Sequence, residues 1–132
     1  MSEKVISDST VLLSAVTTTG ISTPFEVSSK RNVMLGVLGA ATATGTLKFR
    51  VSFQETVNLT AAADADNIWV YRAFKDLNNT GTITGGDTGL AFTANKAHMI
   101  ELNSNRIKWV AAEVSAHTSG TYTVKGYTCD NQ

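Results

Sequence analysis

The sequence predicts an all-β fold, a jelly-roll-like β-sandwich of about eight to nine short antiparallel strands. Threonine, valine and aromatic residues occur throughout the 132 residues, and these residue types favour strands over helices. In residues 45–54 every second residue from Leu47 to Phe53 is apolar, as expected of a strand with one buried face. The two halves of the chain also resemble each other. These three observations together predict a sandwich with an internal pseudo-repeat.

Turn-forming clusters of glycine, asparagine and serine divide the chain into the expected strands. In order, these cover residues 11–17, 22–27, 32–39, 45–54, 68–74, 88–93, 98–102, 106–115 and 120–128. Residues 1–10 are polar and are expected to form an N-terminal arm, which leaves residues 11–132 as a single β-sandwich domain. Residues 60–66 are rich in alanine but too few to hold a helix, so we expect a loop there.

The internal repeat relates positions that are 75 residues apart. It aligns Glu26 with Glu101 and Gly45 with Gly120 without a gap, and apolar positions stay in register over three consecutive strands. Each half is then expected to contain a strand, a short turn, a second strand, another turn and a third strand. A chance alignment is the alternative, because all alternating strands share a period of two. A true repeat of this length predicts a two-fold related sandwich and not a solenoid.

Composition argues against several classes of partner. The formal net charge is +0 and only 17% of residues are charged, so no electrostatic field favours nucleic acid or an anionic membrane. No stretch approaches the roughly 20 apolar residues that cross a bilayer, and the first ten residues do not have the pattern of a secretion signal. A single cysteine cannot form a disulfide framework. We therefore expect no nucleic-acid or membrane partner.

An enzyme is not expected. The only histidines, His98 and His117, lack a neighbouring nucleophile or a metal-ligand spacing, and no hydrolase or phosphate-binding motif is present. The sequence thus indicates no catalytic residues and no cofactor.

Residues 76–87 resemble a calcium-binding loop of the EF-hand or dockerin kind. Asp76, Asn78 and Thr80 take the first three ligand positions of such a loop, and Asp87 takes the twelfth. Only two of these ligands are carboxylates, however, and the flanking segments look like strands where the motif has helices. We favour a polar hairpin loop, with Ca²⁺ binding as the alternative.

Several expected strands are apolar on both faces and therefore need a second covering layer. In residues 106–114 the side chain of Trp109 is expected on the face away from the core. In residues 32–38 the same is expected of Met34 and Leu38. Trp69 and Tyr71 repeat the pattern in residues 68–71. The cover is either a neighbouring subunit or a loop of the same chain, for which residues 55–67 and 75–97 are candidates.

Two segments, residues 25–31 and 100–106, are each followed by an apolar strand and then by a Thr- and Gly-containing turn, at residues 43–46 and 118–121. This arrangement resembles the small β-sandwich structural proteins of tailed bacteriophages, namely capsid decoration or cement proteins and related head-fibre and tail-fibre modules. The resemblance covers residues 21–55 and 98–129 and describes hairpin architecture, not a site.

The resemblance implies a virion structural protein. Such a protein binds the outer surface of a phage head, has the major capsid protein as its partner, and associates as a dimer or trimer. It would be found on the capsid surface, and in the host cytoplasm during assembly. The residues expected at its interface are Trp69, Tyr71, Trp109 and Met34. A carbohydrate- or receptor-binding module of a head or tail fibre is the alternative.

Overall fold

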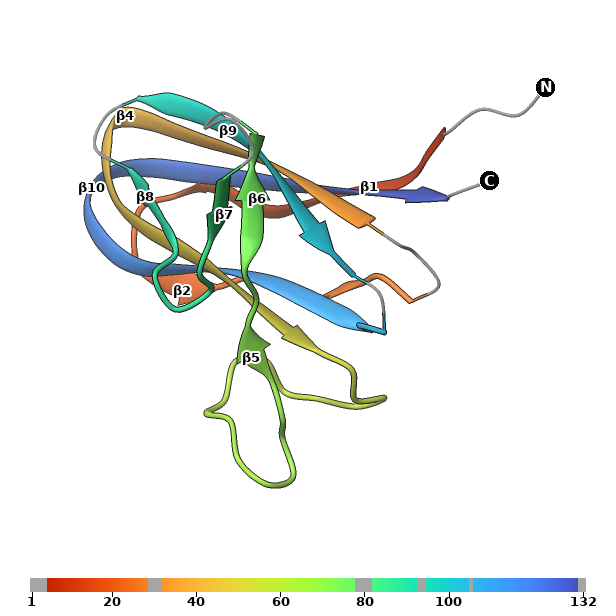
Figure 1. Cartoon of the computed structure of the whole chain (residues 1–132). Coiled ribbons are helices and arrows are strands. Elements are labelled where there is room, and N and C mark those ends of the chain that lie inside the picture. Colours follow the sequence, from red (N-terminus) through yellow and green to blue (C-terminus); the bar gives the residue numbers. More distant parts are fainter. Residues whose placement is uncertain (1–4, 29–31, 78–81, 93–94, 105, 131–132) are drawn as a thin grey trace.

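The computed structural model describes the chain except residues 1–4, 29–31, 78–81, 93–94, 105 and 131–132. Ten strands form one antiparallel sheet, and the described residues contain no α-helix, which confirms the predicted all-β class (Figure 1). The main path through the sheet is β1-β10-β4-β9-β6-β7, with β2 and β3 paired to β10, and β5 and β8 paired to β4. In chain order the strands are β1 (Val5–Val16), β2 (Gly20–Ile21), β3 (Phe25–Glu26), β4 (Asn32–Ser52), β5 (Val70–Tyr71), β6 (Phe74–Asp76), β7 (Thr82–Thr84), β8 (Leu90–Phe92), β9 (Lys96–Asn103) and β10 (Trp109–Asp130).

Two strands are far longer than expected, because two predicted turns are corners inside continuous strands. β4 has 21 residues and joins the expected strands 32–39 and 45–54, whereas β10 has 22 residues and joins 106–115 and 120–128. The two strands pair with each other along their whole length, with register shifts between Val114 and Thr121. Shifts of this kind bend a ribbon without ending its pairing. The turn-like composition therefore marks bends and not hairpins.

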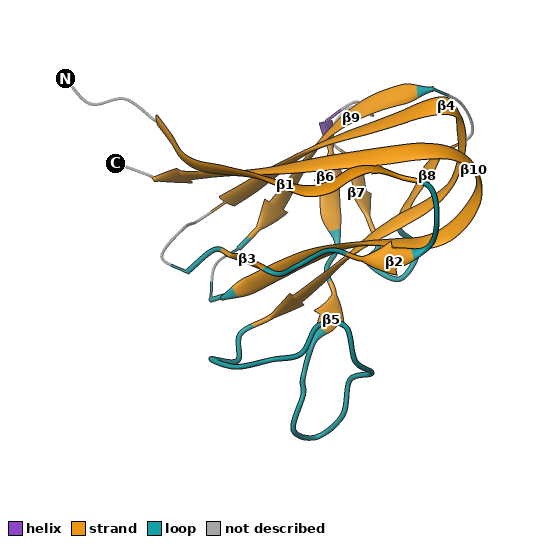
Figure 2. Ribbon diagram, turned by 180° about the vertical axis from the view of Figure 1, so that it is seen from behind, coloured by secondary structure: helices purple, strands orange, loops and turns teal. Residues whose placement is uncertain are grey.

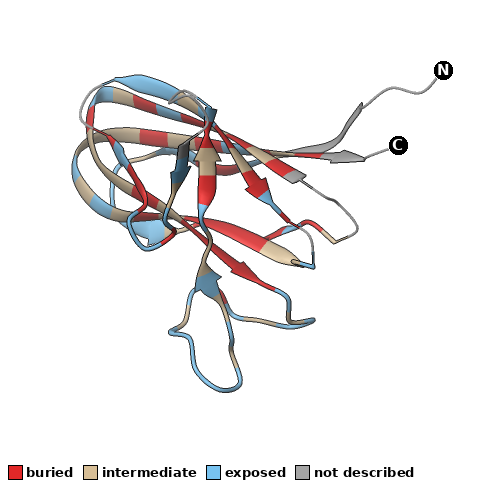
Figure 3. Ribbon diagram, in the orientation of Figure 1, coloured by how far each residue is buried: buried red, intermediate tan, exposed pale blue. Residues whose placement is uncertain are grey.

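The corner folds the sheet over on itself, so the two halves of β4 and β10 lie in different layers (Figures 1 and 2). One layer, here called the upper layer, contains β1, the second half of β10, the first half of β4, and β9. The lower layer contains the other halves of β4 and β10 together with β2, β3, β5 and β8. One hydrophobic cluster draws on both layers, as the buried positions in Figure 3 show. Its largest fully buried side chains include Tyr122, Phe49, Phe74, Phe92, Leu35 and Leu47.

The strand pairing follows the 75-residue repeat. In the lower layer Phe25 of β3 pairs with Val110 of β10, and in the upper layer the equivalent residues, Ile100 of β9 and Leu35 of β4, pair in the same way. If the sequence alignment were due to chance, equivalent residues would have no reason to pair with equivalent residues on the neighbouring strand. The pairing therefore supports an internal repeat.

The central pair of strands obeys the same rule. Arg50 of β4 pairs with Ala111 of β10 in the lower layer, and their equivalents, Lys125 of β10 and Gly36 of β4, pair in the upper layer. The paired halves of β4 and β10, together with β3 and β9, are thus related by a pseudo-two-fold axis, and the positions of these strands on the outer face of one layer have counterparts on the other.

Two expectations about individual segments differ from the structure. Residues 5–10, expected in the N-terminal arm, belong to β1, where Val5 pairs with Asp130 and Thr10 with Gly126. Phe53, expected in the core, is 67% exposed. The ladder of β4 ends at Ser52, so the alternation that places Val51 inside does not continue to Phe53.

Glycine is required where the two long strands cross at the corner. Gly120 has a φ of 85°, in the left-handed region, and a Cβ atom there would overlap the backbone of Ala43 and lie 2.6 Å from the carbonyl oxygen of Ala40. Its repeat equivalent, Gly45, has no room either, because a Cβ atom would lie 2.6 Å from the hydroxyl oxygen of Tyr122. The aligned glycines thus allow the close approach that bends both strands.

Candidate functional site

The residues predicted at an interface lie on the outer faces of both layers. Trp69 precedes β5, Tyr71 ends it, and Trp109 begins the lower half of β10, whereas Met34 lies on β4 in the upper layer. All four side chains are partly buried. Met34 and Trp109 are repeat equivalents, since they are 75 positions apart. The fold therefore brings the three aromatic residues to one layer and places Met34 on the other.

Trp69 and Tyr71 belong to a cover that the chain itself lays over the lower layer. The indole N–H of Trp69 donates to the carbonyl oxygen of Ala61 at 2.9 Å, and its ring meets that of Tyr71 edge to face, with centroids 5.2 Å apart. The guanidinium of Arg50 lies 4.0 Å from the centroid of the Trp69 ring, a cation–π contact. The loop at residues 55–67 was one of the two covers expected from the sequence.

Arg50 is the centre of this covered face. It is 9% exposed, and its Nε donates to an oxygen of Glu113 at 2.9 Å while one terminal nitrogen donates to the carbonyl oxygen of Leu59 at 2.6 Å. The Tyr71 hydroxyl donates to the same Glu113 oxygen at 2.8 Å. Burial raises the pKa of Tyr71, and the hydrogen bond to Glu113 raises it further. Because these groups satisfy one another, they hold the loop in place.

Trp109 also contacts the chain's own loop. Its indole N–H donates to the carbonyl oxygen of Glu55 at 3.3 Å. The ammonium of Lys108 lies 5.4 Å from the Trp109 ring centroid and 2.8 Å from a carboxylate oxygen of Glu55. The polar groups of the three aromatic residues therefore have partners within the chain.

The outer face of the upper layer is different, because apolar side chains remain exposed on it. Leu38 is 49% exposed, Met99 52% and Val11 52%. The register places Val11, Lys125, Gly36 and Met99 in one row across β1, β10, β4 and β9. No described segment lies over this row, so the upper layer presents an apolar face with Lys125 within it.

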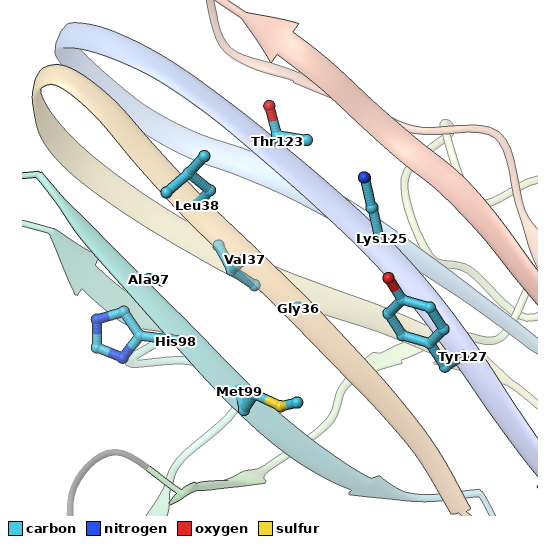
Figure 4. A pocket seen from close by; sticks show the side chains of 9 residues that line it. All are labelled: Gly36, Val37, Leu38, Ala97, His98, Met99, Thr123, Lys125 and Tyr127. Atoms are coloured by element: carbon cyan, nitrogen blue, oxygen red, sulfur yellow. The ribbon is translucent and has the colours of Figure 1, made fainter. Parts of the chain in front are cut away.

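A groove of about 420 Å³ runs along this face between β9, β4 and β10 (Figure 4). Leu38 and Val37 project from the central strand, Lys125 and Tyr127 line one side, and Met99 lines the other. The complete lining is Gly36, Val37, Leu38, Ala97, His98, Met99, Thr123, Lys125 and Tyr127. An open groove with mainly apolar walls and one cation fits a protein segment better than a small substrate.

Sequence reasoning found only part of this face. Met34 and Leu38 stand out because both faces of their strand are apolar. Met99 and Tyr127 alternate with buried residues, so in the sequence they look like the solvent-exposed positions of ordinary strands and were not singled out. The internal repeat could have pointed to this face, because it makes residues 34–38 equivalent to residues 109–113.

The structure describes two of the four expected calcium ligands, Asp76 and Asp87. Asp76 lies in β6 and is buried, and one of its carboxylate oxygens is 3.1 Å from Nδ1 of His98. Asp87 is exposed in a turn, while Asn78 and Thr80 lie outside the described residues. Within the described part of the chain, no group of three or more His, Cys, Asp or Glu side chains is arranged to hold a metal ion.

Millimolar Ca²⁺ is expected to leave the melting temperature of the protein unchanged, because Asp76 faces His98. Differential scanning calorimetry with and without Ca²⁺, with Mg²⁺ as the control, measures this. A rise in melting temperature specific to Ca²⁺ would show that residues 76–87 form the ion site.

No described helix is long and apolar enough to span a bilayer. No protein-family model matches the sequence, and no curated protein matches it. The crystal structure of the SPBc2 prophage-derived protein YomS is similar, with a TM-score of 0.71 and 16% sequence identity, over 98% of this chain and 96% of that chain. The two proteins share a fold. At this identity the likeness concerns the architecture alone, and it extends over nearly the full length of both chains.

Proposed function

We propose that this protein is a non-enzymatic structural protein of a tailed-phage virion, a capsid decoration or cement protein that binds the outer surface of the head. The likeness in fold to a prophage-derived protein supports a phage origin. The repeated strand pattern, which resembles phage structural proteins, supports a structural role. In this proposal the folded-over sheet is a jelly-roll-like β-sandwich.

The observation that carries the proposal is the apolar outer face of the upper layer. Leu38 and Met99 are each about half exposed, so covering one of them contributes about 1 kcal/mol. One such contact is weak, but many copies on a closed shell sum their contacts. A protein that binds only the assembled shell stabilises that state by mass action. The partner in this mechanism is the major capsid protein.

Two further features belong to the proposal. Copies associate as a dimer or trimer on the capsid surface, after synthesis in the host cytoplasm. The near-equal numbers of acidic and basic residues, 11 of each, leave little charge repulsion between neighbouring copies.

Replacement of Met99 by glutamate is expected to reduce attachment to undecorated phage heads at least tenfold, because it places a carboxylate in an apolar contact. Co-sedimentation of the purified protein with heads measures this. Val70→Glu is the matched control, since Val70 is 56% exposed but lies in β5 of the lower layer. Failure of the unaltered protein to sediment with heads would contradict the proposed function.

A carbohydrate- or receptor-binding module is the second candidate, and the exposed ring of Phe53 favours it. Phe53 and Trp69 share a second groove with Arg72 and Arg106, a combination that also occurs where sugars stack on aromatic rings. Iodide quenching of tryptophan fluorescence separates the two candidates. Both tryptophans lie in the lower layer, so protection by an oligosaccharide supports a sugar-binding module, whereas a cement protein that binds heads through its upper layer leaves the quenching unchanged when heads are added.

A further inference from the structure

The pseudo-two-fold axis allows the two outer faces to be compared residue by residue. Arg50 and Lys125 are equivalent, and each pairs across the β4–β10 ladder with a small residue, Ala111 or Gly36. The chain covers the first of these cations with its own loop and leaves the second in an open groove. The contacts of Arg50 in the lower layer therefore indicate what a segment covering Lys125 in the upper layer must provide.

The cation beneath the cover has three kinds of contact, two of them from the cover. Arg50 receives the ring face of Trp69 at 4.0 Å and the backbone carbonyl of Leu59 at 2.6 Å, both from the covering segment. The third contact, a carboxylate, comes from Glu113 of the neighbouring strand at 2.9 Å. A buried cation needs all of these to offset its desolvation.

Lys125 has counterparts to none of these contacts among the described residues. The repeat equivalent of Glu113 is Leu38, so no carboxylate stands beside Lys125 on the adjacent strand. No ion pair or cation–π contact joins its ammonium to a described side chain. A cover over this face must therefore bring the carboxylate as well as the aromatic ring.

We propose that the groove formed by Leu38, Met99 and Lys125 binds an extended segment of a partner protein that carries an aromatic side chain and a carboxylate. The segment lies over the upper layer as residues 59–71 lie over the lower layer. Its ring packs on the apolar groove beside Lys125, and its carboxylate pairs with the Lys125 ammonium. This inference rests on the proposed function in taking the upper face as the docking surface, and it adds the chemistry of the segment that docks.

The floor of the groove suits such a segment. A Cβ atom on Gly36 would meet nothing closer than the Tyr127 ring, at 3.9 Å, so an approaching side chain can reach the strand backbone. Charge complementarity favours an acidic segment, because the lining contains the cation of Lys125 and no carboxylate. One cation is too few for a nucleic-acid backbone, which needs several phosphate contacts.

A synthetic peptide with the sequence of residues 57–71 is the probe, because it contains Trp69, Tyr71 and two aspartates and comes from the segment that covers the equivalent face. It is titrated into the ¹⁵N-labelled full chain and followed by NMR. We expect the NMR signals of Gly36, Met99 and Lys125 to show saturable chemical-shift changes. The same peptide with both aromatic residues replaced by alanine is expected to bind at least tenfold more weakly.

Charge variants of the protein test the role of the cation. Lys125→Glu is expected to weaken peptide binding at least tenfold, whereas Arg72→Glu, which lies outside the groove, leaves it unchanged. Shifts confined to Ala111 and Glu113 would mean that the peptide only displaces the chain's own loop, and would overturn the inference. So would an absence of shifts at millimolar peptide.

The peptide experiment contains no phage heads, so the two proposals can fail separately. Peptide binding without co-sedimentation overturns the proposed function and leaves the groove chemistry standing. Co-sedimentation that is lost in Met99→Glu but kept in Lys125→Glu, with no peptide binding, overturns the groove chemistry alone.

Discussion

Replacing Arg50 by alanine is expected to lower the free energy of unfolding by about 3 kcal/mol, because it leaves a buried carboxylate without its cation. The Arg50 side chain is 11% exposed and that of Glu113 14%. The substitution also removes the donor to the Leu59 carbonyl oxygen and the cation beneath the Trp69 ring. The loop that covers the lower layer then loses its main attachment.

Urea denaturation followed by circular dichroism measures this change, and the repeat provides a matched control. Lys125→Ala removes the equivalent cation from the uncovered face, where its ammonium has no ion pair or cation–π contact with a described side chain. Its effect is expected to stay within about 0.5 kcal/mol. Equal losses in the two variants would show that the cover over Arg50 does not stabilise the fold.

Replacing Gly120 by alanine is expected to destabilise the protein by about 3 kcal/mol, for two reasons that act together. A residue with a Cβ atom resists the left-handed conformation that Gly120 adopts, with φ at 85°. The added methyl group would also overlap Ala43 in the facing strand at the corner. Backbone atoms cannot move aside as a flexible side chain can, so the bend itself must change.

Thermal and urea unfolding of Gly120→Ala measure the loss, with Gly36→Ala as the control. Gly36 lies in the same strand pair, and a Cβ atom there makes only an ordinary contact at 3.9 Å with the Tyr127 ring. Its effect is expected to stay within about 1 kcal/mol of the unaltered protein. A Gly120→Ala variant as stable as Gly36→Ala would show that the corner tolerates a side chain.

The candidate site was only partly predictable. A pattern of apolar residues on both faces of a strand identified Met34, Leu38 and Trp109 as needing cover, and a loop of the same chain was one of the expected covers. Which of these faces the loop reaches depends on contacts between residues far apart in the sequence, such as Arg50 with Glu113. Side-chain alternation gives the face on which a residue lies, and tertiary packing decides whether another segment covers that face.

The calcium-like loop illustrates the same limit. The spacing of Asp76, Asn78, Thr80 and Asp87 matches a ligand pattern, but spacing along the chain does not fix the direction of a side chain. Pairing of β6 with β9 brings Asp76 opposite the strand that carries His98, and its carboxylate faces the imidazole. A contact across the sheet thus determines the surroundings of Asp76, one of the four residues in the calcium-like spacing.

The sequence by itself determined the all-β class, the alternation of the core strands and the 75-residue repeat, because these depend on local propensity and on a side-chain period of two. Tertiary structure alone decided that the turns predicted at residues 43–46 and 118–121 are corners of continuous strands, since their residues accept either a hairpin or a bend until a facing strand is present. It also decided which of two equivalent faces is covered. The repeat makes the faces alike, and the residues 55–71 that follow β4 cover one of them.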